Sequence, residues 1–225
     1  MPHYPSRHSW AVTPAEAAEI QNELRAEVVL SDDFGPVLTV AGVDAGFEDD
    51  GNTTRAAVVV LGFPELDVRE RALARRPTTF PYIPGFLSFR EIPAVLAALE
   101  QLTIVPDLLL CDGMGILHPR RFGIASHLGV ITGLPAIGVG KSPFIGRHEP
   151  VPDERGAWRP IIDRGQTIGA ALRTRAGTKP LYISPGHRIS LESAIEYVLR
   201  CAPRYRLPET TRQADHLASH EKDKG

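Results

Sequence analysis

Two strongly apolar segments of this chain each end in an aspartate, and this pattern constrains the fold more than any other feature. Residues 37–43 lead into Asp44, and residues 107–111 lead into Asp112. Segments with so few polar positions predict buried strands of a sheet that helices cover on both faces. A carboxylate at the end of such a strand must be paired, hydrogen-bonded or bound to a metal, because burying a lone charge is too costly. We therefore expect an α/β protein with an acidic centre at its strand ends.

A third carboxylate, Glu91, lies in a proline- and aromatic-rich segment between these two strands. In one interpretation it is structural, because Ser88 and Glu91 have the spacing of a helix capping box. That interpretation places Pro93 beyond the first helical turn, where its ring opposes a preceding carbonyl group. In the other, the helix begins near Arg90 and Glu91 is free to turn inward. We favour the second interpretation.

Asp44, Glu91 and Asp112 thus come from three separate elements and offer only oxygen ligands. Such ligands suit Mg²⁺, whereas the sequence has no Cys/His cluster with the spacing of a zinc site. With no obvious cationic partner nearby, the three acids predict one or two Mg²⁺ ions that support phosphodiester hydrolysis. The competing interpretation makes Asp44 an Asx-turn residue and Asp112 the start of an ordinary Asp-Gly turn.

The remaining pattern predicts one domain, residues 1–225, with about 1–10 and 221–225 flexible. Helices are expected at 13–28, where a capping box begins the first one, and at 90–102, 123–132, 190–199 and 208–219. Strands are expected at 37–44, 55–63, 67–74, 107–111 and 135–139, with two or three more between 159 and 182. A meander followed by alternating helices and strands describes a mixed central sheet flanked by helices.

Charge and composition limit the classes of function without selecting one. The 25 Lys and Arg residues against 27 Asp and Glu residues give a net charge of −2, so contact with nucleic acid must depend on local clusters. Such clusters occur at 69–76 and at 120–121, although solvated surface arginines are at least as good an interpretation of the first. The two cysteines do not predict a disulfide scaffold. Because residues 1–10 contain no secretory signal, we expect a soluble, cytoplasmic protein.

Several sequence blocks together resemble the endonuclease V family. They are VAGVD at 40–44, PYIPGFLSFRE at 81–91, CDGMGILHPRRFG at 111–123, GVGK at 138–141 and SPGHRIS at 184–190. The second and third blocks are specific, and the resemblance covers nearly the whole chain. It implies a ribonuclease H-like fold and a repair endonuclease that depends on Mg²⁺, with Mn²⁺ as a substitute. Such an enzyme recognises deoxyinosine in DNA and cuts the second phosphodiester bond on its 3′ side, leaving 3′-hydroxyl and 5′-phosphate ends.

The resemblance also assigns roles to residues near the reacting phosphate. Asp44, Glu91 and Asp112 hold the metal, and Asp215 is a further carboxylate near it, at a position where family members vary. His118 and Lys141 approach the scissile phosphate. Lysine acts there as a point charge, and histidine as a hydrogen-bond donor or proton shuttle.

A second set of residues is expected to bind the damaged base. Tyr82 is the wedge that stacks where the base leaves the duplex, although a core aromatic residue would be the default without the resemblance. Gly85, Gly113 and Gly115 shape the pocket for flipped hypoxanthine. The other expected substrate contacts are Pro81, Ile83, Pro84, Arg90, Arg120 and His187. His127, on the apolar face of a helix, is instead expected to be a core histidine.

Three alternatives to this function remain open at the level of sequence. They are an inosine-specific ribonuclease, another ribonuclease H-like nuclease specific for nucleic-acid structure, and a binder of distorted nucleic acid without catalytic activity. The last alternative requires the acids to be structural. Nucleic acid is the expected partner in every case, whereas no membrane or protein partner is indicated, and we expect a monomer.

Overall fold

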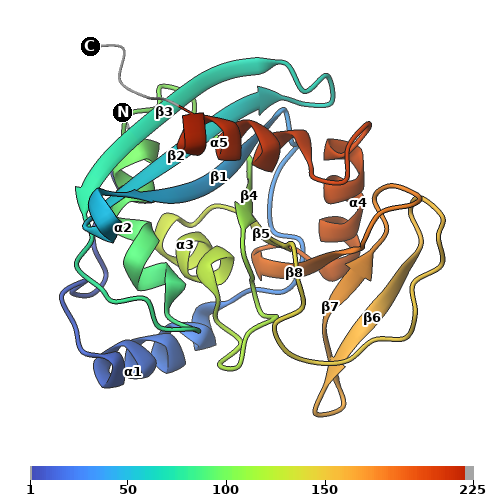
Figure 1. Cartoon of the computed structure of the whole chain (residues 1–225), viewed down its shortest axis with the longest axis horizontal. Coiled ribbons are helices and arrows are strands. Elements are labelled where there is room, and N and C mark those ends of the chain that lie inside the picture. Colours follow the sequence, from blue (N-terminus) through green and yellow to red (C-terminus); the bar gives the residue numbers. More distant parts are fainter. Residues whose placement is uncertain (1, 221–225) are drawn as a thin grey trace.

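An eight-stranded sheet organises the computed structural model, which describes residues 2–220 (Figure 1). Its strands are β1 (Thr39–Glu48), β2 (Thr53–Gly62), β3 (Val68–Pro77), β4 (Leu108–Asp112), β5 (Ala136–Gly140), β6 (Trp158–Asp163), β7 (Gln166–Leu172) and β8 (Leu181–His187). They are ordered β3-β2-β1-β4-β5-β8-β7-β6. The first three form an antiparallel meander, and β4 and β5 run parallel to β1. The predicted mixed sheet is confirmed.

Helices cover both faces of this sheet, as the apolar strands predicted (Figure 1). The helices are α1 (Pro14–Leu24), α2 (Leu87–Leu99), α3 (Ile124–Thr132), α4 (Leu191–Cys201) and α5 (Glu209–His220). Alternate residues of a strand point to opposite faces. Val58 accordingly packs in the core beneath α2 and α3, whereas Val59 packs in the core beneath α4 and α5. Among residues 2–220, no helix is long and apolar enough to cross a bilayer.

The first strand continues past the aspartate that was expected to end it. Asp44 pairs with Ala57 of β2, and the pairing continues as far as Glu48 and Thr53. The prediction that Asp44 closes the strand is therefore wrong. Backbone pairing in a hairpin does not require apolar side chains, so the end of the apolar run marks a change of surroundings and not the end of the strand.

The helix that carries Glu91 begins earlier than predicted. It starts at Leu87, has no side-chain cap and contains Pro93 in its interior. Ser88 is not a cap, because it lies inside the helix and its hydroxyl hydrogen-bonds to His127 Nδ1 at 3.0 Å. The expected start near Arg90 is wrong, whereas the inward position of Glu91 is confirmed by its 7% exposure.

The N-terminal segment, expected to be flexible, packs on the helical layer. His8 Nε2 lies 2.8 Å from His127 Nε2, and the Trp10 ring packs edge-on against Phe89. His127 is fully buried with both ring nitrogens hydrogen-bonded, which confirms it as a core histidine. The capping box of α1, formed by Thr13 and Glu16, is also confirmed. The expectation for residues 221–225 lies outside the described residues.

The last helix lies directly on β1 because Gly42 has no side chain. A Cβ atom at Gly42 would lie 1.9 Å from the carbonyl oxygen of Thr210, at the start of α5. Further along β1, a Cβ atom at Gly46 would lie 3.4 Å from the carbonyl oxygen of Ala218 in α5, which is an ordinary van der Waals contact. The close approach at Gly42 determines where the residues of α5 stand relative to β1.

Replacing Gly42 with alanine is therefore expected to destabilise the protein by about 1–3 kcal/mol, the usual cost of overpacking a filled core. Chemical denaturation measures this loss. Gly46→Ala is the matched control on the same strand, and its stability should change by less than about 1 kcal/mol. Equal stability of the Gly42→Ala and wild-type proteins would contradict the contact between α5 and β1.

Candidate active site

Three carboxylates converge where β1, β4 and α5 meet. Val43 and Cys111 are partners in the parallel β1–β4 pair, so Asp44 and Asp112 follow at neighbouring positions. Asp215 reaches them from α5, and one oxygen of each carboxylate lies within 4.8 Å of the others. We call Asp44, Asp112 and Asp215 the acidic cluster. Of the three acids that the sequence predicted to converge, Asp44 and Asp112 meet here together with Asp215, and these three hard oxygen donors fit a divalent cation such as Mg²⁺.

Glu91 approaches the acidic cluster from α2, on the opposite face of the sheet from α5. It does not belong to the group of oxygens within 4.8 Å of one another. Burial raises its pKa well above the usual value, and the charges of Asp44 and Asp112 raise it further. Glu91 is therefore close enough to share the field of the cluster, and its role as a metal ligand stays a prediction.

Lys141, which the resemblance places at the scissile phosphate, lies within the acidic cluster as a cationic partner. Lys141 Nζ is 2.5 Å from Asp112 Oδ2 and 3.6 Å from Asp215 Oδ1. The expectation that the acids lack such a partner is wrong, because the pairing of β4 with β5 places Lys141 beside Asp112. Burial opposes the lysine charge, but hydrogen bonding and attraction to Asp112 outweigh it and raise the pKa of Lys141.

Burial and the neighbouring negative charge together change the protonation of Asp44. The pKa of Asp44 is raised to about 7, first by burial and then by the charge of Asp112, although Lys141 opposes the rise. One lysine therefore does not neutralise the group. A divalent cation would replace a bound proton with a charge that attracts all three carboxylates, so cation binding and proton release are coupled here.

A pocket of about 300 Å³ adjoins the acidic cluster. The two are contiguous because Gly113, which lines the pocket, directly follows Asp112. Tyr82 stands at the pocket with 72% of its surface exposed, which excludes the core alternative for this ring. The expected residues Ile83, Pro84 and Gly85 line the same pocket, together with His118. Phe144 also lines the pocket and was not expected from the sequence.

The Gly85 carbonyl oxygen, beside this pocket, accepts hydrogen bonds from three side chains. The donors are Gln21 Nε2 at 3.1 Å, His118 Nε2 at 3.0 Å and Arg120 Nη2 at 2.7 Å. We call these three side chains the Gly85 clamp. Gly85 itself has a φ of 85°, which is strained for any residue with a side chain. The clamp therefore holds a turn that only glycine adopts easily, and it keeps Tyr82 and Pro84 in a defined position.

His118 and Arg120, which the resemblance assigns to the substrate, form hydrogen bonds within the protein in this structure. The backbone N–H of Arg120 donates to His118 Nδ1 at 3.2 Å, so His118 Nε2 carries the proton that it donates to Gly85. Burial, with the charge of Arg120, lowers the pKa of His118 to about 4, and the ring is neutral at pH 7. Both ring nitrogens are engaged within the protein. The expected phosphate contact of His118 stays a prediction.

Gln21, the third member of the Gly85 clamp, was missed. It is buried on the inner side of α1, on the same side as Ala17 and Leu24. Its amide also donates to the Phe122 carbonyl, and its oxygen accepts from Arg120 Nε at 2.5 Å. A polar residue in the apolar stripe of a helix was the signal that could have identified it.

Three other expected substrate residues do not line the pocket. Arg90 donates to the Phe80 carbonyl at 3.0 Å and lies over the Phe47 ring, so it supports the segment before Tyr82. Pro81 is exposed at the start of that segment. Gly115 does not line the pocket, because a Cβ atom there would lie 2.0 Å from the Pro185 carbonyl oxygen.

His187 is not brought to the site. It pairs with Ala136 at the beginning of β5, whereas Asp112 pairs with Val139 near the end of that strand. Its Nδ1 accepts a hydrogen bond from the backbone of Val29 at 3.3 Å. The expectation of a substrate contact depended on sequence proximity to a helix N-terminus, and the antiparallel direction of β8 carries that end away from the acidic cluster.

Comparisons with known proteins agree on one family. The family model described as Endonuclease V matches residues 22–216. Endonuclease V of Trichormus variabilis is 64% identical over 214 residues, covering 95% of this chain and 97% of the relative. The crystal structure of endonuclease V from Streptomyces avermitilis superposes with a TM-score of 0.89 at 46% identity and covers 96% of both chains. This similarity confirms the ribonuclease H-like fold.

A more distant relative was solved with nucleic acid. Endonuclease V of Ciona intestinalis superposes with a TM-score of 0.82 at 29% identity, covering 92% of this chain and 97% of the other. That structure is a complex with a 23mer DNA containing an inosine followed by a ribo-adenosine.

The raised pKa of Asp44 predicts how stability depends on pH without metal. Since the folded state holds this proton more tightly than the unfolded chain, the contribution of Asp44 to stability falls as pH rises from about 4 to about 7. Asp44→Asn removes this loss, so its melting temperature at pH 7 in a chelator should exceed the wild-type value, by about 2–4 °C per kcal/mol.

Thermal melts across this pH range, with and without Mg²⁺, measure the effect. The wild-type protein should gain stability from Mg²⁺, and Asp44→Asn should gain much less. Asp50→Asn, at an exposed turn residue, is the control and should behave as the wild type does. Identical pH profiles for Asp44→Asn and wild type would refute the raised pKa of Asp44.

Proposed function

The chain belongs to the endonuclease V family, and from this membership we propose that it is a metal-dependent endonuclease that recognises deoxyinosine in DNA. In this proposal it hydrolyses the second phosphodiester bond 3′ to the lesion and leaves 3′-hydroxyl and 5′-phosphate ends. The metal is Mg²⁺, for which Mn²⁺ substitutes. The observation that carries the proposal is an acidic cluster contiguous with a pocket of about 300 Å³, at which an exposed Tyr82 stands.

The metal would be held by Asp44, Asp112 and Asp215, with Glu91 behind them. When bound, Mg²⁺ would orient a water molecule and stabilise the charge on the phosphate oxygens. Lys141 lies at the same place and keeps its proton, because the surrounding carboxylates raise its pKa. It therefore supplies a fixed positive charge that can move from Asp112 to a phosphate oxygen of the substrate.

The pocket would hold the base after it has left the duplex, with Tyr82 stacked in the space left behind. In the part of the chain that the structure describes, the backbone N–H groups of Gly85 and Met114 donate to no protein acceptor, whereas the Gly113 N–H donates to Val139. Free donors suit the O6 acceptor of hypoxanthine. Adenine presents an amino group there instead, so a donor would face a donor and stay unpaired.

An inosine-specific ribonuclease is the second candidate. The complex of the Ciona intestinalis relative contains a ribo-adenosine directly after the inosine, so that protein accepts a ribose next to the lesion. The acidic cluster and the pocket suit either sugar. We therefore propose DNA as the principal substrate and include RNA in the assay that tests the function.

The decisive assay measures nicking of matched duplexes that differ by one inosine, with and without Mg²⁺. Nicking should require both the inosine and the metal, and a matched inosine RNA should be cut more slowly. Asp112→Asn should abolish nicking while leaving most of the DNA binding, since it removes a metal ligand and not the pocket. Asp50→Asn is the control and should retain activity. Full activity of Asp112→Asn would reject the metal site.

Tyr82→Ala tests the wedge. Loss of the ring should weaken binding to inosine duplexes by about 1–3 kcal/mol, the usual contribution of base stacking on an aromatic residue. Tyr82→Phe keeps the ring and should bind like the wild type. Fluorescence anisotropy measures both variants, and an unchanged affinity of Tyr82→Ala would show that the exposed ring does not stack on the substrate.

A further inference from the structure

Two loops beside the acidic cluster carry many cations and almost no acids. Between Asp163 and Glu192 the chain has no acidic residue, and the same is true between Glu196 and Glu209. The turn at 173–180 and the loop at 202–207 lie within these segments. In a chain with a net charge of −2, such a local excess of positive charge is the pattern expected at a contact with a polyanion.

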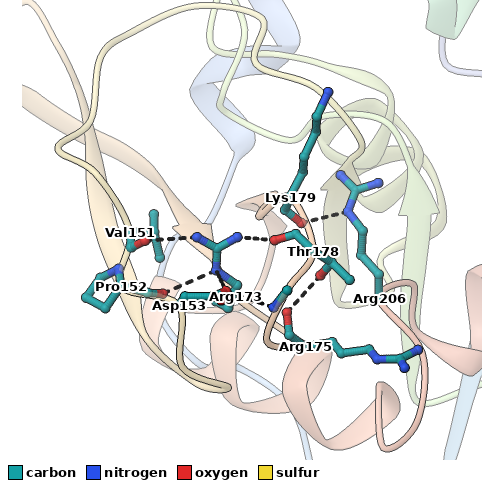
Figure 2. Close-up of polar contacts among 9 residues, drawn as sticks. Val151, Pro152, Asp153, Arg173, Arg175, Thr178, Lys179 and Arg206 are labelled. Atoms are coloured by element: carbon teal, nitrogen blue, oxygen red, sulfur yellow. Dashed lines mark hydrogen bonds and ion pairs between the residues drawn. The ribbon is translucent and has the colours of Figure 1, made fainter.

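Arg173 uses its own charge to hold the turn together (Figure 2). Its guanidinium group donates to the carbonyl oxygens of Val151 at 2.9 Å and Pro152 at 3.2 Å, and also to that of Thr178. Asp153, the acid nearest to this turn, lies 3.5 Å from Arg173 and accepts the backbone N–H of residue 177 at 2.8 Å. Both charges are therefore engaged in bracing the turn.

Arg206 connects the turn, the loop and the catalytic lysine. Its guanidinium donates to the carbonyl oxygens of Lys179 at 2.7 Å, Pro180 at 3.0 Å and Lys141 at 2.8 Å (Figure 2 shows the first of these bonds). The carbonyl of Arg206 in turn accepts from the Thr174 hydroxyl at 2.6 Å. Because Lys141 Nζ lies 2.5 Å from Asp112, these bonds tie both loops to the active centre.

Three further cations in the same loops do not hold the loops in place. Arg175, Lys179 and Arg204 are exposed, and within residues 2–220 their charged groups form neither a hydrogen bond nor an ion pair. Figure 2 shows the Lys179 and Arg175 side chains extending away from the bracing bonds. Glu209, the acid that follows Arg204 in the chain, is held by Arg212 at 3.0 Å; the hydrogen bond from Arg212, and to a smaller extent the charge of Arg204, lower the pKa of Glu209. These three side chains therefore expose positive charge to solvent on loops that Arg173 and Arg206 hold in place.

We propose that Arg175, Lys179 and Arg204 form a cationic platform that binds the phosphate backbone of DNA beside the scissile bond. The inference rests on the proposed function and extends it to a surface outside the pocket and the acidic cluster. Phosphate contacts of this kind position the duplex without reading its sequence. Because Arg173 and Arg206 already hold the loops in place, little ordering is needed when DNA binds.

The test compares two triple variants that change the net charge equally. Arg175→Gln/Lys179→Gln/Arg204→Gln removes the platform, and Arg69→Gln/Arg71→Gln/Arg76→Gln removes three cations from β3, at the opposite part of the sheet. Binding to duplexes with and without one inosine is measured by anisotropy in EDTA, over a series of KCl concentrations. Thermal unfolding verifies that each variant is folded, and Lys179→Gln alone is the fallback.

The platform variant should bind both duplexes more weakly, and the slope of log K against log salt should become shallower by about 3, near one for each lost phosphate contact. Lys179→Gln alone should change the slope by about 1, and the β3 variant should keep the wild-type slope. A wild-type slope in the platform variant, or an equal change in the β3 variant, would overturn the platform. The inosine preference of the wild type is read in the same data, and its absence would instead count against the proposed function.

Discussion

The crowding of negative charge among the half-buried carboxylates of the acidic cluster is the interaction on which this site depends. Asp44 and Asp112 stand side by side because β1 and β4 are parallel neighbours, and α5 adds Asp215 because Gly42 lets the helix lie directly on β1. Burial and then the charge of Asp112 raise the pKa of Asp44, although Lys141, which pairs with Asp112, opposes the rise. A site that is electrostatically unfavourable without a cation is suited to binding one, and the stability lost there is the cost of function.

The base pocket depends instead on a rigid turn at Gly85. Three side chains converge on the carbonyl oxygen of Gly85, and two of them, His118 and Arg120, belong to the segment that follows Asp112. The pocket and the acidic cluster are therefore parts of one loop system. A flipped base and its phosphate would meet protein groups whose relative positions are already determined, and such preorganisation reduces the entropy lost on binding.

Much of the acidic cluster could be predicted from local pattern. Apolar runs identify buried strands, and parallel strands bring their carboxyl ends together, so Asp44 and Asp112 were expected to meet even though β1 continues beyond Asp44. Exposure of Tyr82 agrees with the expected wedge, whereas His187 lies away from the site because β8 runs antiparallel to β5. The start of α2 was misplaced because both interpretations began the helix at or after Ser88, whereas Ser88 lies inside the helix and its hydroxyl is buried against His127.

The sequence by itself determined the mixed α/β class, the hard oxygen donors and the family, because these depend on periodicity, residue chemistry and contiguous motifs. Only the tertiary structure decided which groups neutralise one another. Lys141 pairs with Asp112 through the β4–β5 register, and Arg206 holds the Lys141 backbone from a loop far along the chain. Gln21 joins the Gly85 clamp from the first helix. Such partners are separated by long stretches of sequence, and local physical rules do not specify which distant groups the packing of helices on a sheet brings within hydrogen-bonding distance.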